Sequence, residues 1–173
     1  ETPVYTSTFT GLQNGDVPTG LVYTPSPNYA GSPGVHTINV QDIQFPVPGN
    51  YLVTYLTGML YVNPNPNLAK AIRPILRCVE EVKNNPNYTL RARFEYQNDN
   101  PTAVFIRIGT LNNIFATGPY SGTQTELFQP GSGSFDILFN GAKMTWTLVS
   151  ENKKKKKCDV SFFHLIQEHQ LHS

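Results

Sequence analysis

The stretch SFDILFNGAKMTWTLV, residues 134–149, contains two independent signs of antiparallel β-structure. Asn140-Gly141 is the preferred dipeptide for a two-residue type I′ turn between paired strands. A turn there would place apolar residues opposite one another on one face, as Phe139 and Ala142, Ile137 and Met144, and Phe135 and Trp146. Because the turn chemistry and the apolar pattern select the same register, these residues predict a β-hairpin.

Residues 88–96, YTLRARFEY, alternate between apolar and polar side chains without interruption, which predicts a half-buried strand. Shorter apolar stretches recur along the chain and are separated by turn-forming residues, among them 14 Pro and 13 Gly. Charged residues make up only 14% of the chain, too few for a helical bundle. We therefore expect an all-β fold, with residues 1–173 forming a single domain. The expected architecture is a two-sheet antiparallel jelly-roll sandwich of about eight to ten strands.

Two regions of the chain have an apolar pattern that departs from simple alternation. In residues 35–45 the pattern changes parity, which predicts a bulge or break near residues 41–42. In residues 68–82 the apolar positions repeat at the spacing of one helix face: Leu68, Ile72, Ile75, Val79 and Val82. Since Pro is tolerated in a first helical turn, a short helix near residues 73–83 is one interpretation. A strand from Ile72 to Val79 is the other.

Two further stretches are apolar on both faces, residues 51–62 (YLVTYLTGMLYV) and residues 158–166 (CDVSFFHLI). A strand at the surface of an isolated sandwich needs only one apolar face, so the surplus face indicates a contact between subunits. The residues expected in this oligomer interface are Tyr51, Val53, Tyr55, Tyr61, Phe163 and Leu165.

The charges of the chain are unevenly distributed. The net charge is only +1, and no Lys or Arg precedes Lys70. One block near the C-terminus holds five consecutive cations: Lys153, Lys154, Lys155, Lys156 and Lys157. A block of like charge cannot be packed, so it predicts a solvated loop, which either keeps a strand end soluble or contacts a polyanion such as phosphate, glycan or RNA.

The chain contains two cysteines, Cys78 and Cys158, which are too few for a zinc site. They would form one disulfide if the fold brought them together. No nucleophile elbow, phosphate-binding loop or metalloprotease motif occurs, and no pair of acids lies in an apolar setting. We therefore expect a non-enzymatic protein without catalytic residues, metal or cofactor. No apolar run approaches 18 residues, so no membrane span is expected.

The stretch IQFPVPGNYLVTY, residues 43–55, contains Phe45, Pro48, Gly49 and Tyr51, and an aromatic, apolar stretch follows at residues 158–166. These elements resemble the globular heads of the tumour necrosis factor and complement superfamily, which has bacterial and viral relatives. Residues 141–148 fit a family turn and strand, except that Ala142 replaces an acid. The resemblance implies a jelly roll that forms homotrimers, is secreted or exposed on a virion, and binds a protein or glycan receptor through its loops.

Two functions are therefore expected from the sequence. The first is an oligomeric recognition or structural head, extracellular or on a virion surface. The alternative is a small icosahedral viral capsid (coat) protein, for which nucleic acid would also be a partner. The lack of cations before Lys70 argues against a basic RNA-binding arm, although Lys153–Lys157 would be able to face a genome.

Overall fold

The computed structural model describes residues 3–26, 31–47, 49–109, 112–116, 118–150 and 155–160. These residues form twelve β-strands and no helix, which confirms the all-β class. The chain divides into two compact units, an N-terminal unit of residues 1–61 and a C-terminal unit of residues 62–173. Two clusters of contacts do not decide whether the chain unfolds in one step or two, so the single domain stays a prediction.

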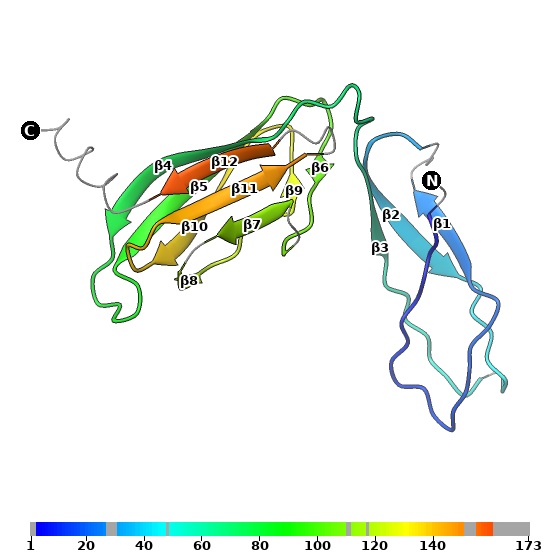
Figure 1. Cartoon of the computed structure of the whole chain (residues 1–173). Helices are drawn as coiled ribbons and strands as arrows, with labels where there is room; N and C mark the ends of the chain where they lie inside the picture. The colour runs from blue at the N-terminus through cyan, green and yellow to red at the C-terminus, as the bar shows by residue number, and fades with distance from the viewer. Residues whose placement is uncertain are drawn as a thin grey trace, which may run out of the picture. The chain divides into compact units, whose positions relative to one another are not determined.

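The N-terminal unit is built on a three-stranded sheet of order β1-β2-β3 (Figure 1), with strands Val22–Ser26, Gly34–Gln41 and Gly58–Val62. β1 and β2 pair antiparallel from Val22 opposite Gln41 to Ser26 opposite Thr37. β2 ends at Gln41, and Asp42 follows with a φ of 63°. The predicted break near residues 41–42 is therefore confirmed. The left-handed backbone at Asp42 changes whether the even-numbered or the odd-numbered positions face inward.

The C-terminal unit contains two larger antiparallel sheets (Figure 1). The first has the order β4-β5-β10-β8, with strands Arg73–Glu81, Leu90–Asn98, Gly131–Phe139 and Tyr120–Ser121. The second has the order β12-β11-β7, with strands Lys155–Val160, Met144–Val149 and Asn113–Ala116. A short pair joins β6 and β9, Val104–Phe105 and Leu127–Phe128. The jelly-roll connectivity stays a prediction.

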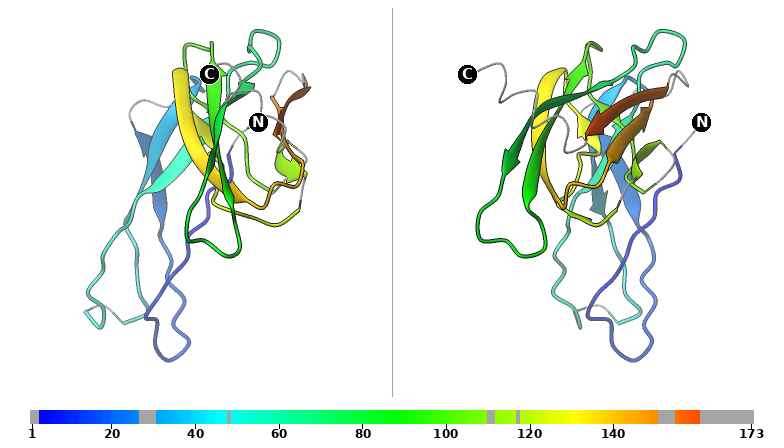
Figure 2. Two further views of the ribbon diagram at one scale, coloured as in Figure 1. Left: turned by 90° about the vertical axis from the view of Figure 1, so that its left-hand side faces the viewer. Right: turned by 60° about the vertical axis from the view of Figure 1, so that its left-hand side comes forward.

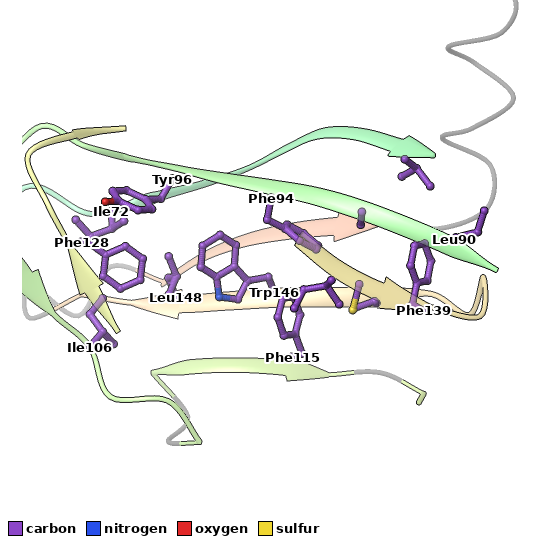
Figure 3. Close-up of a cluster of buried hydrophobic side chains, with 14 of the residues drawn as sticks. Ile72, Leu90, Phe94, Tyr96, Ile106, Phe115, Phe128, Phe139, Trp146 and Leu148 are labelled. Carbon is purple, nitrogen blue, oxygen red and sulfur yellow. The ribbon is translucent and has the colours of Figure 1, made fainter. Parts of the chain in front are cut away.

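The core of the C-terminal unit lies between these two sheets and is dominated by aromatic rings (Figure 3). Trp146 of β11 is fully buried, and its ring centroid lies 4.8 Å from that of Phe135 and 5.7 Å from that of Phe94 on the opposite sheet. Edge-to-face contacts of this kind add about 0.5–1.5 kcal/mol each to the free energy gained by burial. Inward-facing rings from both sheets make this unit a sandwich.

The helix considered near residues 73–83 is wrong, because β4 is a strand over Arg73–Glu81. A β-bulge between Leu76 and Cys78 shifts the register of this strand. Leu76 lies opposite Phe94 and Val79 opposite Ala92, so both face the core although they are three residues apart. Ile75, a member of the helical repeat, lies opposite Glu95 on the outer face, so the repeat does not mark one buried face.

The hairpin predicted for residues 134–149 is also wrong in its pairing. β10 pairs with β5 and β8, whereas β11 pairs with β7 and β12, so the two strands belong to different sheets. Gly141 has a φ of 91°, but Asn140 is not among the residues of positive φ, so the turn is not type I′. The predicted inward face is correct except for Ala142, which is exposed, and Phe135 and Trp146 meet across the core instead of side by side.

Candidate functional site

The large apolar side chains of the N-terminal unit are either exposed or only half-buried in its described part. In its described part no Ala, Val, Leu, Ile, Met, Phe or Tyr reaches full burial, whereas the apolar residues that do so all lie between Ile72 and Leu148. The exposed apolar side chains of this unit are Val4, Phe9, Val17, Val22, Val47, Leu52, Tyr55, Leu56, Met59 and Tyr61. These exposed apolar side chains make the N-terminal unit a candidate for association.

A hollow of about 670 Å³ lies within the N-terminal unit. It is bordered by residues 3–12, by strands β1–β3 and by residues 51–60. Its wall is rich in aromatic rings: the centroids of Tyr5 and Tyr23 lie 5.7 Å apart, and those of Phe45 and Tyr51 4.3 Å apart. The hollow is open to solvent on one side and is not an enclosed void.

Tyrosine hydroxyls hold the border of the hollow in place. The Tyr51 hydroxyl donates to Asp16 Oδ2 at 2.7 Å and accepts the Gln13 backbone N–H at 3.1 Å. Donation to the Asp16 carboxylate raises the pKa of Tyr51 above its ordinary value. The Tyr55 hydroxyl accepts the Ile43 backbone N–H at 3.4 Å. These bonds join residues 51–55 to two distant parts of the same unit.

Residues 51–57, which we call the 51–57 segment, begin with the side-chain alternation of a strand at residues 51–54 but lack its hydrogen bonds, and residues 55–57 are all exposed. Tyr51 and Val53 are half-buried, whereas Leu52 and Thr54 are exposed. Among the described residues, neither this segment nor residues 3–10 makes a backbone-to-backbone hydrogen bond. The strand expected over residues 51–62 is therefore limited to β3, and the 51–57 segment continues from it as a trace without an arrow (Figure 2).

The structure places the predicted interface residues in three different settings. Tyr51 and Val53 face the hollow, and Tyr55 and Tyr61 are exposed. Phe163 and Leu165 lie outside the described residues, so their role stays a prediction. The sequence analysis missed Leu52 and Leu56, which are among the most exposed apolar side chains of the chain. With apolar residues at both parities, nothing in the sequence showed which parity faces outward.

Three of the five clustered lysines belong to a strand, so the prediction of a loop is wrong for them. Lys155, Lys156 and Lys157 begin β12 and are exposed, whereas Lys153 and Lys154 lie outside the described residues. β12 is the edge strand of its sheet and pairs only with β11. Lysines on an edge strand discourage the addition of a further strand, and contact with a polyanion stays a prediction.

The two cysteines face different sides of the C-terminal unit, and neither forms a disulfide. Cys78 lies opposite Arg93 on the outer face of its sheet, because the bulge turns it away from the core. Cys158 lies opposite Trp146 and packs against the core. Burial, assisted by the neighbouring Asp159 carboxylate, raises the pKa of Cys158 to about 11. The fold does not bring the two thiols together, so the disulfide considered in the sequence analysis does not form.

The outer face of the four-stranded sheet is polar and its charges are paired. Ion pairs join Arg73 with Asp99, Arg77 with Glu95, Arg91 with Glu80, and Arg93 with Asp136. Hydrogen bonds from the arginines lower the pKa values of Glu80 and Glu95. A face whose charges already have partners and whose surroundings are water is a poor site for apolar association, in contrast to the N-terminal unit.

The chain has no match among protein-family models, among curated proteins or among solved structures. Within the described ranges, no three His, Cys, Asp or Glu side chains are grouped so that they would hold a metal ion. The same residues include no helix with the length and hydropathy to cross a membrane. The exposed apolar surface and hollow of the N-terminal unit are therefore the candidate site.

Proposed function

We propose that this protein is a non-enzymatic structural and recognition head that assembles with copies of itself through the N-terminal unit. The observation that carries the proposal is the absence of a buried apolar core in the described part of that unit, together with its exposed apolar side chains. Complete burial of one exposed Leu is worth about 1.5–3 kcal/mol. Several such side chains supply a free energy of association that the isolated chain does not use.

The charge distribution favours a second copy as the partner. The N-terminal unit contains no cation, because Lys70 is the first in the chain, and its only acids are Glu1, Asp16 and Asp42. Two such surfaces meet without removing many charges from water, which is the main cost of burying a polar surface. A polyanionic partner would find no cation to bind on this unit.

The trimeric state and the receptor follow from the sequence resemblance of residues 43–55 and 158–166 rather than from contacts. A trimer of heads would present the loops of each copy to a protein or glycan at an extracellular or virion surface. The native mass of the full chain, measured by light scattering over micromolar concentrations, tests the assembly. We expect three times the mass of one chain. A monomer at all concentrations would refute the proposal.

The coat protein is the second candidate, and the exposed Lys155, Lys156 and Lys157 favour it. In that case electron microscopy would show closed shells, and nucleic acid would copurify. Replacing Lys153–Lys157 by Ser should weaken binding to RNA and reduce the slope of affinity against salt by about one unit per lost phosphate contact. Binding that is unchanged in both respects would leave these lysines with a solubility role alone.

A further inference from the structure

We infer that the 51–57 segment pairs strand to strand with a second copy of this chain and closes the hollow beside it. The inference rests on the proposed self-assembly and specifies how it is made. The segment is extended and makes no backbone-to-backbone hydrogen bond among the described residues. Its row of N–H and C=O groups is a template to which another strand can add.

The composition of the segment leaves it open to pairing. Its sequence, YLVTYLT, consists of β-branched, aromatic and Leu residues and contains no Pro, Gly or charge. Natural edge strands are usually protected by Lys, Pro, bulges or short length. β12 shows such protection in this same chain, because Lys155, Lys156 and Lys157 are exposed along it. The contrast indicates that the lysines prevent further strands from pairing with β12, whereas the 51–57 segment remains available for pairing.

The segment is also held in the conformation that pairing requires. Tyr51 is bonded to Asp16 and Gln13, and Tyr55 to Ile43, so both tyrosines are fixed from the side of the hollow. The exposed parity then presents Leu52 and Leu56 to the solvent. A segment ordered in advance loses less conformational entropy on association, which favours a specific contact over a loose apolar one.

The apolar hollow and the small number of charges on the N-terminal unit favour an incoming strand from the same protein. An added strand would bring alternate apolar side chains over an aromatic hollow of about 670 Å³. The exposed apolar residues of the N-terminal unit supply such side chains, and the unit has no cation and three acids. Self-pairing therefore covers the apolar surfaces of two copies in one contact.

Hydrogen exchange of the full-length chain tests this inference separately from the proposed function. We expect the amides of residues 52–56 to be protected in the assembled protein and to exchange at least about tenfold faster after dilution has separated the copies. An assembled protein in which these amides exchange freely would overturn the inference and leave the self-assembly standing. A chain that never assembles would overturn both.

Proline variants provide a second measurement. Pro removes the N–H that a ladder requires, and in an extended segment only alternate N–H groups point to one edge. We therefore expect one of Val53→Pro and Thr54→Pro to weaken assembly at least about tenfold relative to Val53→Ala and Thr54→Ala, which retain the N–H. Trp146 fluorescence shows whether the C-terminal unit remains folded in each variant, because that ring is fully buried there. Two proline variants that assemble as well as their alanine counterparts would contradict the inference.

Discussion

The two units have the same share of apolar residues, 24 of 61 in the N-terminal unit and 43 of 112 in the C-terminal unit, yet only one of them forms a core. What separates them is charge: three charged residues against 22. The C-terminal unit places its ion pairs outside and its rings inside. The N-terminal unit has few charged side chains to cover an outer face, and apolar side chains remain exposed there. The share of apolar residues sets how much apolar surface a unit can bury. Whether one chain buries that surface by itself depends on whether its polar and apolar side chains lie on opposite faces.

Separation of the units is the strongest test of this comparison. A fragment of residues 62–173 contains the whole core, and we expect it to unfold cooperatively in urea when Trp146 fluorescence is followed. A fragment of residues 1–61 should show fast exchange of nearly all amides, because a unit of this size without a core is not stable. A well-protected N-terminal fragment that remains monomeric would contradict the distinction drawn between the units.

Truncation of one ring in each unit should have very different effects on stability. Phe94 is fully buried and packs against Trp146, so we expect Phe94→Ala to lower the free energy of unfolding by about 3–5 kcal/mol. Phe9 is exposed, and Phe9→Ala should change the free energy of unfolding by less than about 0.5 kcal/mol. Urea denaturation measures both values. Equal losses in the two variants would show that the N-terminal unit has a core after all.

The smallest expected effect tests whether assembly depends on the apolar surface of the N-terminal unit or on any exposed Leu. Leu56 in the N-terminal unit and Leu68 in the C-terminal unit are each 82% exposed, so they form a matched pair. We expect Leu56→Ser to raise the dissociation constant of the assembly about tenfold or more, because it should lose at least about 1.4 kcal/mol of association free energy. Leu68→Ser should leave the dissociation constant unchanged. If both variants dissociate equally, assembly does not depend on the N-terminal unit.

The sequence predicted which face of a strand is buried better than it predicted the partner of that strand. Phe135, Ile137 and Trp146 point inward as expected, because alternation along a strand depends only on local pleating. Their strands lie in different sheets, because the same inward face is produced by a hairpin and by a chain that crosses from one sheet to the other. The choice depends on long-range contacts that no short stretch contains.

The candidate site was only partly predicted from the sequence. The apolar character of residues 51–62 placed four of the six predicted interface residues in the N-terminal unit, whereas the other two, Phe163 and Leu165, lie outside the described residues. Which residues face outward changes between Val53 and Gly58. The half-buried positions are odd-numbered up to Val53 and even-numbered from Gly58 onward. The bulge at Arg77 had a similar effect on β4, since one inserted residue reversed the faces that follow it.

The position of Cys158 has a consequence for how the protein tolerates its chemical surroundings. With a pKa of about 11, only about one thiol in ten thousand is a thiolate at neutral pH, and thiolate is the form that oxidants and alkylating agents attack. The Cys158 thiol therefore resists oxidation and alkylation, an argument that does not extend to Cys78 on the outer face. Because neither cysteine forms a disulfide, reductant in the buffer should neither loosen nor improve the sandwich.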